Sequence, residues 1–372
     1  MSDKTIRVLQ VIGIMNRGGA EAMIMNLYRN IDRTKVQFDF VEHTSEEAAF
    51  DQEIISMGGR IFRCPKYTVK NHFLYMSWWK RFFYEHSQKF AIVHGHIGST
   101  AAIYLDIAKK NGLFTIAHSH NTNGTLSVKE LMYRVISFPT RYIADYFFGC
   151  SVEAGKDRFG KKIAKDNQRY RILKNAIDTG FYKFDIGVRN EVRKEFNVGS
   201  ELVVGHIGRF EFQKNHTFLI KIFEKILSID KNAKLILVGD GPLKNEIYQQ
   251  VKAAGIRKNV IFTGIRSDVN RILQALDVFT MPSLYEGLPV SIVEAQTAGV
   301  PCVLSDNVPK DCCITPLVTS LFLKDNMDVW AQHIIERAKI QRKDYSSEIK
   351  KNGFDIVETS KWLEEFYLEH SL

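Results

Sequence analysis

The fold is decided most clearly by residues 278–295, which read VFTMPSLYEGLPVSIVEA. The first four residues, 278–281, are the kind of short apolar run with β-branched and aromatic members that forms strands. Pro289 suits the first turn of a helix, and mostly apolar residues follow it. The segment therefore predicts a strand, a loop and a helix in succession, which is the building unit of a parallel sheet covered by helices.

The same unit recurs on both sides of this segment, because short β-branched runs alternate with longer amphipathic stretches along the chain. In the second half, strands are expected at 203–208, 235–239, 260–263, 278–281, 302–305 and 321–323. Helices should begin there near Asn215, Pro242, Asp268, Pro289 and Met327. An earlier series of strands is expected at 7–13, 38–41, 60–63, 91–96, 114–120, 146–150 and 170–173.

Two strand series predict an α/β protein with two doubly wound, Rossmann-like domains, whose strand ends would line a ligand cleft. The loose, glycine-containing segment 178–200 marks the boundary. The expected domains are 1–178 and 179–352. Residues 353–372 should form a closing helix that packs back on the first domain, since their apolar side chains recur at helical spacing.

Composition excludes several classes of protein. A chain of 372 residues with 45% hydrophobic and 25% charged residues is neither disordered nor collagen-like. We find no apolar stretch approaching the ~18 residues of a spanning helix and no cleavable leader, so we expect an unprocessed cytoplasmic protein. The five cysteines show no paired spacing and are expected to be reduced thiols, with the vicinal pair Cys312 and Cys313 as a weak redox alternative.

Charge is distributed unevenly. Residues 1–178 hold 26 of the 51 basic and 17 of the 42 acidic side chains, which leaves 25 of each for residues 179–372. A basic first half favours an extended anionic partner, with an ordinary solvated surface as the alternative. Residues 71–90 mix Lys80, Arg81 and Lys89 with aromatic residues, among them Trp78, Trp79, Phe82, Phe83 and Tyr84. This pattern suits a helix lying on an anionic membrane, or else a helix packed on its own sheet.

The second half contains a candidate anion site. Arg209 follows a strand end and Lys214 stands five residues later, two cations that suit a diphosphate. Glu286 lies in the loop of the opening segment, and the backbone N–H groups around Gly287 and Leu288 precede a helix and should point at the same anion. Glu294 lies in an otherwise apolar helix, where ribose hydroxyls would be suitable partners for a carboxylate. The alternative is that these side chains simply face solvent.

The first half contributes two further features. Gly18 and Gly19 precede a helix and let backbone N–H groups approach an anion, although a simple tight turn would use the same residues. Two His-x-His pairs, His94 with His96 and His118 with His120, end neighbouring strands. Neither carboxylates nor thiolates accompany them, so neutral hydrogen-bonding or packed imidazoles are favoured over a metal site.

These residues resemble family 4 glycosyltransferases, which have the GT-B fold. The resemblance rests on six segments: Gly18 to Glu21, Leu173 to Asp178, Gly208 and Arg209 with Lys214, Val238 to Pro242, Phe262 to Gly264, and the pair Glu286 and Glu294. It implies that residues 1–178 bind the acceptor and residues 179–352 the donor nucleotide sugar. Bacterial capsule and exopolysaccharide enzymes have segments similar to residues 117–121 and 299–301. The resemblance implies retaining transfer of a hexosyl group from a nucleotide diphosphate sugar, with UDP-sugars favoured and neither metal nor cofactor.

The family also implies roles for individual residues. Arg209 and Lys214 would hold the diphosphate, and Glu294 the ribose. Glu286, Gly287 and Leu288 would bind the donor sugar. Gly264 and Ile265 would lie beside the base, and Gly18 and Gly19 beside the phosphates. His120 would face the reacting carbon, with His118 as the reserve.

The expected partners are the nucleotide sugar, a glycan or lipid-diphosphate-linked acceptor, and the anionic inner face of the cell membrane, which the basic N-terminal domain would contact peripherally. No nucleic-acid-binding module is recognised, so we expect no nucleic acid. Two other functions remain open: a GT-B nucleotide-sugar epimerase or hydrolase, and an inactive partner subunit of a glycosyltransferase.

Overall fold

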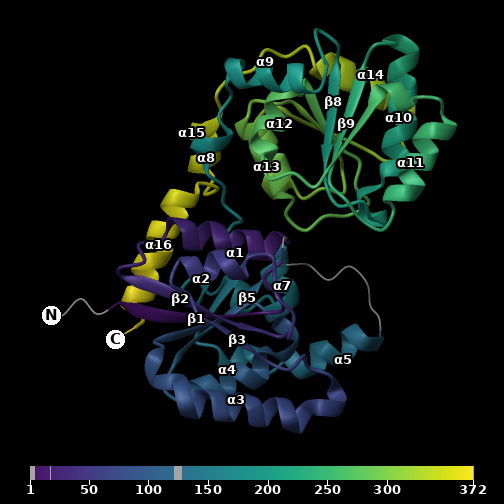
Figure 1. Ribbon diagram of the computed structural model, residues 1–372. Helices are drawn as coiled ribbons and strands as arrows, with labels where there is room; N and C mark the ends of the chain where they lie inside the picture. The colour runs from purple at the N-terminus through teal and green to yellow at the C-terminus, as the bar shows by residue number, and fades with distance from the viewer. Residues whose placement is uncertain (1–4, 17, 121–127, 372) are drawn as a thin grey trace. The chain divides into compact units, whose positions relative to one another are not determined.

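The computed structural model describes residues 5–16, 18–120 and 128–371, and it divides into two compact units (Figure 1). The first unit comprises Met1–Ala176 together with Ile356–Leu372, and the second comprises Ile177–Asp355. The chain therefore crosses between units at residues 176 and 355, close to the boundaries expected at 178 and 352.

The first unit is built on a parallel sheet of seven strands in the described part of the chain. The strands are β1 (Ile6–Ile12), β2 (Val36–Glu42), β3 (Ile61–Arg63), β4 (Ile92–Gly95), β5 (Phe114–Ser119), β6 (Tyr146–Gly149) and β7 (Tyr170–Ile172). Their order is β3-β2-β1-β4-β5-β6-β7, and β1 pairs with β2 and β4 on its two sides. All seven lie within a few residues of the predicted positions.

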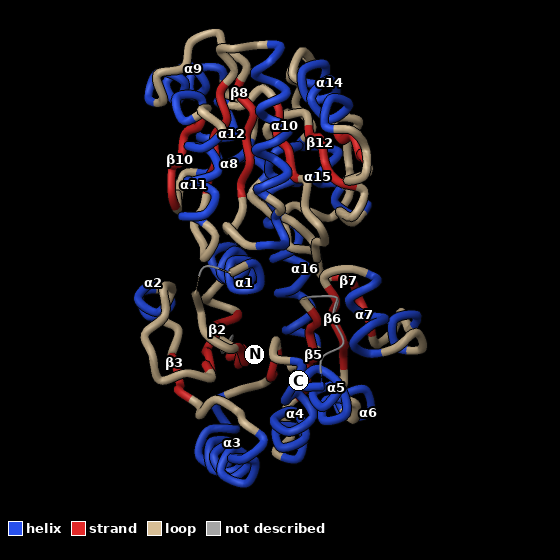
Figure 2. The backbone as a smooth tube through the Cα atoms, turned by 90° about the vertical axis from the view of Figure 1, so that its right-hand side faces the viewer, coloured by secondary structure: helices blue, strands red, loops and turns tan. Residues whose placement is uncertain are grey.

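Helices cover both faces of this sheet (Figure 2). They are α1 (Gly19–Asn30), α2 (Asp51–Ser56), α3 (His72–His86), α4 (Ala101–Lys110), α5 (Val128–Ser137), α6 (Thr140–Ile143), α7 (Val152–Phe159) and α16 (Ile356–Glu369). Alternate residues of β1 enter different cores: Val8 and Ile12 pack with α1 and α16, whereas Leu9 and Val11 pack with α3 and α4. This period of two is expected of a strand that is buried on both faces.

The second unit repeats the architecture with six parallel strands among its residues, all of which are described. They are β8 (Val203–Ile207), β9 (Lys234–Val238), β10 (Val260–Gly264), β11 (Val278–Met281), β12 (Cys302–Ser305) and β13 (Val318–Leu321), in the order β10-β9-β8-β11-β12-β13. The last strand was predicted at 321–323 and lies three residues earlier. The sequence pattern missed its start because Thr319 and Ser320 are polar. An edge strand needs fewer apolar residues than a central strand.

The helices of the second unit also lie on both faces of its sheet (Figure 2). They are α8 (Thr179–Tyr182), α9 (Ile186–Glu195), α10 (His216–Ile229), α11 (Lys244–Ala253), α12 (Val269–Ala275), α13 (Val290–Thr297), α14 (Met327–Arg337) and α15 (Ser346–Lys351). Two apolar cores result, one containing Val203 and Phe279 and the other Val204 and Val278.

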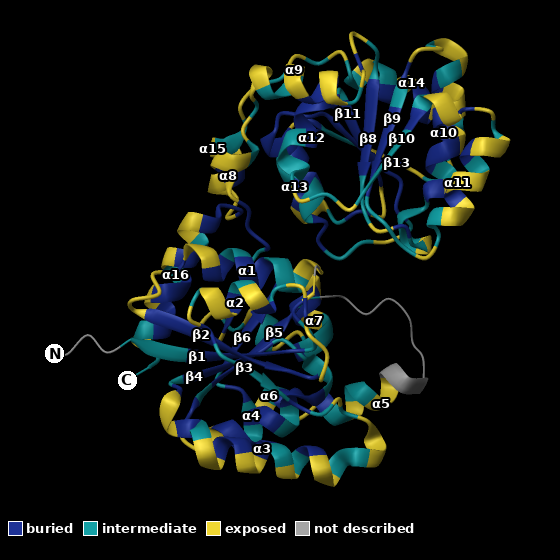
Figure 3. Cartoon of the chain, viewed as in Figure 1, coloured by how far each residue is buried: buried dark blue, intermediate teal, exposed yellow. Residues whose placement is uncertain are grey.

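Helix α3 favours the second of the two alternatives for residues 71–90, packing on its own sheet. Trp79, Phe82 and Phe83 are buried in the core of the first unit and cannot serve as membrane anchors. Half-buried Trp78 stacks on Phe82 with ring centroids 5.1 Å apart. Of the aromatic residues named for this helix, only Tyr84 is exposed, and Phe73 near the start of the helix is exposed as well. Figure 3 shows buried, intermediate and exposed residues along α3. The aromatic stripe therefore mainly packs this helix onto its own sheet.

All five cysteines are free thiols, as expected. Within the described residues, every helix is too short or too polar to cross a membrane.

Candidate functional site

The carboxyl edge of the second sheet gathers the candidate donor residues. Arg209 follows β8, and Lys214 ends a single 3-10 turn before α10. Gly264 ends β10 and Ile265 follows it. The remaining candidates lie in the loop after β11 and in the helix behind it: Glu286, Gly287, Leu288 and, on α13, Glu294. Parallel strands bring their ends to one edge, which is where ligands of open α/β sheets bind.

Lys214 and Glu286 form an ion pair at this edge. The Lys214 ammonium lies 2.8 Å from Glu286 Oε1, and the two side chains are only 16% and 5% exposed. Gln213 donates from its amide nitrogen to the other carboxylate oxygen at 3.1 Å. The Leu284 N–H donates to the Gln213 carbonyl at 2.8 Å and ties the two loops together. A charge-assisted pair held by two loops is pre-organised. Nothing in the sequence pattern had identified Gln213 as a residue of this site.

A glycine turn fixes the loop that carries Arg209. The Phe210 N–H donates to the Asp240 carbonyl at 2.9 Å, and the Leu243 N–H donates to the Phe210 carbonyl at 3.0 Å. A Cβ on Gly241 would lie 2.6–2.9 Å from the backbone of Phe210, so only glycine fits there. The Arg209 guanidinium lies 3.1 Å from the Glu211 carboxylate, and the Arg209 side chain is 70% exposed. It is therefore less constrained than the Lys214 side chain.

Glu294 has a partner that the sequence did not suggest. The Tyr182 hydroxyl, from α8, donates to Glu294 Oε1 at 2.7 Å. Burial raises the pKa of Glu294 to about 7, and the tyrosine hydrogen bond opposes that rise. The carboxyl is thus partly enclosed, as its apolar neighbours indicated. The 112 residues that separate it from Tyr182 left no local pattern to reveal the contact.

Backbone donors and an open strand end complete this edge. Among the described residues, the N–H groups of Gly287, Leu288 and Val290 make no hydrogen bond, and Val290 begins α13. Such amides can bind an anion.

Gly264, at the end of β10, has a φ of +70°, a left-handed conformation that favours glycine. The next side chain, Ile265, is 66% exposed. The exposed Ile265 side chain and the adjacent glycine form an apolar surface on which a planar ring can pack.

Gly18 and Gly19 lie at the start of α1 in the first unit. Gly18 is the N-cap residue and Gly19 the first residue of the helix. The carboxylate of Glu21 folds back against Gly18, and burial raises the pKa of this carboxyl. A carboxylate at a helix N-terminus occupies the place that an anion would take.

The four histidines meet where β4 and β5 end. His96 Nδ1 lies 2.7 Å from His120 Nε2, and His94 Nε2 lies 3.2 Å from His118 Nδ1. Burial lowers the pKa of all four imidazoles, that of His120 to about 4, so they are neutral near pH 7. Ligand atoms of His94, His96 and His118 lie within 4.8 Å of one another, close enough to share a metal ion. Several of these nitrogens are already engaged in hydrogen bonds. Asn121, which follows His120, lies outside the described residues.

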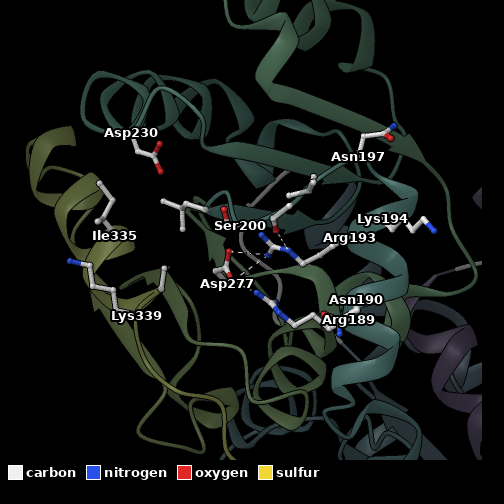
Figure 4. Close-up of a pocket in the computed structure, with 14 residues that line it drawn as sticks. Arg189, Asn190, Arg193, Lys194, Asn197, Ser200, Asp230, Asp277, Ile335 and Lys339 are labelled. Carbon is white, nitrogen blue, oxygen red and sulfur yellow. Dashed lines mark hydrogen bonds and ion pairs between the residues drawn. The ribbon is translucent and has the colours of Figure 1, made fainter.

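Two cavities lie apart from the donor edge. One of about 980 Å³ lies at the amino ends of β8 and β11, where Arg189 and Arg193 converge on Asp277 (Figure 4). Both arginines also donate to carbonyls at the end of α12, so their charges are already compensated. The other, of about 820 Å³, opens at the carboxyl edge of the first sheet. This cavity is lined by three aromatic side chains (Tyr67, Trp78, Tyr133), by hydroxyl groups and by Lys66.

Comparison with known proteins identifies the class. Residues 188–354 match the family described as glycosyl transferases group 1. The chain is 34% identical over 351 residues to the putative glycosyltransferase EpsF of Bacillus subtilis (strain 168), covering 92% of this chain and 90% of that protein. It is also 25% identical over 303 residues, 76% of each chain, to the UDP-Gal:alpha-D-GlcNAc-diphosphoundecaprenol alpha-1,3-galactosyltransferase of Escherichia coli. The chain belongs to the glycosyltransferases, and its residues 188–354 form a group 1 domain.

A solved structure shows the same fold. Anabaena Alr3699/HepE in complex with UDP superposes on 98% of this chain and 100% of its own, with a TM-score of 0.79 and 17% sequence identity. The expected GT-B fold, with two Rossmann-like domains, is confirmed.

Proposed function

We propose that this protein is a retaining, metal-independent glycosyltransferase of family 4. In this proposal it transfers a hexosyl group from a UDP-sugar to a lipid-diphosphate-linked glycan in capsule or exopolysaccharide synthesis. The observation that carries the proposal is the enclosed Lys214–Glu286 pair beside the unpaired amides that begin α13. The name of the E. coli relative supports the donor and acceptor classes, because it specifies UDP-Gal and a diphosphoundecaprenol-linked sugar.

The chemistry follows from the leaving group. As the bond between the anomeric carbon and the diphosphate breaks, negative charge grows on the diphosphate. Lys214, Arg209 and the α13 amides would stabilise that charge without a metal, since pre-organised donors act most strongly where charge develops. Glu286 would both hold Lys214 and accept hydrogen bonds from the sugar. Glu294 would bind the ribose, and the base would lie against Gly264 and Ile265.

Retention would follow from attack on the face that the diphosphate leaves. The acceptor oxygen bonds to the anomeric carbon, and its proton passes to an oxygen of the departing diphosphate, so no further base is needed. Gly19 would supply an additional amide to the phosphates, beside Gly18, whose own N–H donates to the Asn16 carbonyl at 2.9 Å. His120 would contact a sugar hydroxyl.

The cavity of about 820 Å³ suits the sugar of the acceptor. Aromatic rings such as Trp78 can stack on the apolar face of a sugar, and hydroxyl groups such as those of Thr44 and Ser99 can bind its polar edge. Exposed Lys66 at the same cavity would pair with the diphosphate of the lipid carrier.

Peripheral membrane contact is kept in the proposal, with the same basic residues but with different apolar ones. Leu131 and Val135 on α5 are 59% and 68% exposed, and exposed Phe138 and Tyr142 follow them. Lys80 and Arg81 are exposed on the outer face of α3. Exposed apolar side chains combined with a basic domain suit the surface of an anionic bilayer.

Transfer assays test the proposal directly. Purified protein is incubated with labelled UDP-sugars, with and without a lipid-diphosphate-linked glycan, in the presence of EDTA. We expect label in the lipid fraction only when acceptor is present, with the anomeric configuration retained. Release of free sugar without acceptor would instead support a hydrolase. In a melting screen, UDP at ~100 times its Kd should add roughly 2.7 kcal/mol of stability, and failure of every UDP- and GDP-sugar to stabilise the protein would refute donor binding.

A further inference from the structure

Gln10 is the buried end of a hydrogen-bond chain that reaches His120. It lies on β1 with 1% exposure, and its Oε1 lies 2.8 Å from His96 Nε2. The other nitrogen of His96, Nδ1, lies 2.7 Å from His120 Nε2. His120 Nδ1 is buried and has no hydrogen-bond partner among the described residues. This series of hydrogen bonds therefore begins at the Gln10 amide and ends at His120 Nδ1, which has no partner within the described chain.

A second chain of hydrogen bonds runs through Tyr367 on the C-terminal helix α16. The Gln10 side chain lies near the Tyr367 phenol and influences its pKa. The Tyr367 hydroxyl lies 2.6 Å from His94 Nδ1, and His94 Nε2 lies 3.2 Å from His118 Nδ1. His118 Nε2 is likewise buried and unpartnered within the described chain. Both chains belong to the first unit.

Each link needs one donor and one acceptor, which restricts where the protons lie. A neutral imidazole has a single N–H, and an amide oxygen only accepts. If Gln10 Oε1 faces His96, then His96 carries its proton on Nε2 and accepts at Nδ1 from the Nε2–H of His120. The amide nitrogen of Gln10 then faces Tyr367, whose hydroxyl donates to His94. The proton of His94 is again on Nε2, and so is that of His118.

We propose that Gln10 is a positioning residue that holds all four histidines in the Nε2–H tautomer. His120 then presents a lone pair at Nδ1 and can accept a hydrogen bond from a substrate hydroxyl, while His118 presents an N–H donor. Turning the amide of Gln10 around would reverse every link, and His120 would become a donor. Only the meeting of His120 with a sugar hydroxyl rests on the proposed function; the tautomers do not.

Burial raises the pKa of the Tyr367 phenol, and the neighbouring Gln10 amide opposes the rise. The same nitrogens are close enough for a metal ion, as noted above for His94, His96 and His118. Metal binding would remove the lone pairs that the chains use, so it is the competing outcome of the test.

Nitrogen NMR of the full-length protein labelled with ¹⁵N-histidine measures the tautomers without any substrate. Signals are assigned with single His→Gln variants, at pH 7. We expect His94, His96, His118 and His120 to show a protonated Nε2 and an unprotonated Nδ1. Protonated Nδ1 on His96 and His120, or shifts of these signals on titration with Zn²⁺, would overturn the proposal.

Variants separate the two chains. Gln10→Leu removes the acceptor, and the His96 and His120 signals should then report a mixture of tautomers. Gln10→Glu keeps an acceptor toward His96 and should preserve those two signals. Tyr367→Phe should alter His94 and His118 but leave His96 and His120 unchanged. Equal changes in all four signals in every variant would contradict a role for Gln10 and point to a general loss of packing.

Turnover provides the second measurement. Gln10→Leu should lower kcat at least roughly tenfold with the donor KM within twofold, and Gln10→Glu should restore most of it. Unchanged kcat in Gln10→Leu would overturn the positioning role. If wild-type protein transferred no sugar while its tautomers were as expected, the proposed function would fail and the tautomer assignment would stand.

Discussion

The Lys214 ammonium lies 2.8 Å from Glu286 Oε1, although 72 residues separate the two side chains along the sequence. One comes from the loop after β8 and the other from the loop after β11, and β8 and β11 are neighbours in the sheet. Adjacent parallel strands thus bring a cation and a carboxylate together at the edge where the donor is proposed to bind. The pair orients the ammonium before any ligand arrives.

Lys214→Ala should therefore impair transfer more than folding. Loss of one electrostatic stabiliser typically costs about 2.7–4 kcal/mol, so kcat/KM should fall on the order of 10²- to 10³-fold, and UDP binding should weaken. The matched control is Lys244→Ala, which removes a lysine 2.6 Å from Asp240 in a more exposed pair, 43% and 38% exposed. If kcat/KM, measured in the steady state, falls equally in both variants, Lys214 has no specific role.

Glu294→Gln should flatten the pH dependence of stability. Burial raises the pKa of this carboxyl from 4.5 to about 7, so between those values the folded protein keeps a proton that the unfolded chain has lost. Wild-type stability should consequently decrease, by about 2 kcal/mol from this group, as pH rises through that window. The variant lacks this contribution.

Urea unfolding at pH 5 and pH 7.5 measures the effect, with Glu224→Gln as an exposed control on α10. The difference in unfolding free energy between Glu294→Gln and wild type should shift in favour of the variant at the higher pH, whereas the control should track wild type. An identical pH slope in all three proteins would rule out a raised pKa at Glu294.

Much of the fold could be predicted from the sequence, because strands buried on both faces leave short apolar runs separated by helical patterns. All thirteen strands appeared in the prediction, and the one clear displacement is at edge strand β13. The candidate donor residues were also placed at the correct strand ends. Pairings such as Tyr182 with Glu294 could not be predicted, since they depend on how distant loops meet. For Trp79, the sequence left core packing and membrane contact equally open.

Gly241→Ala should disturb the loop that carries Arg209. The added Cβ would meet the Phe210 backbone at 2.6–2.9 Å, so the turn after β9 would have to move. Forcing an extra carbon into such a contact costs typically about 1–3 kcal/mol, and UDP affinity should fall with it. Gly187→Ala in α9 is the control, because its Cβ would meet only the side chain of Asp185 and alanine favours a helix. Thermal unfolding that ranks the two variants equally would contradict this interpretation.

Asp277→Ala should destabilise the second unit without changing donor affinity in the folded protein. The Asp277 carboxylate lies 2.5 Å from the Arg189 guanidinium and 3.2 Å from that of Arg193 (Figure 4). It also accepts a hydrogen bond from the Val203 N–H at 2.8 Å. Its removal leaves two enclosed guanidinium groups without their counter-charge, at a cost of about 3 kcal/mol. Asp328→Ala breaks an exposed pair with Lys225 and should cost less than about 1 kcal/mol. A weaker UDP Kd for folded Asp277→Ala would instead connect this cavity to the donor site.

Val135→Asp should weaken binding to anionic vesicles while leaving transfer to a soluble acceptor analogue intact. Val135 is 68% exposed on α5, and burial of a valine side chain contributes about 1.5 kcal/mol or more, so vesicle affinity should fall about tenfold. Ile229→Asp alters a similarly exposed residue, 62% exposed on α10, and should bind as wild type does. Flotation with and without phosphatidylglycerol, at low and high salt, separates apolar from electrostatic contact. If all three proteins float equally, α5 is not the membrane-binding element; if none floats at any salt concentration, the protein reaches a lipid-linked acceptor without peripheral binding.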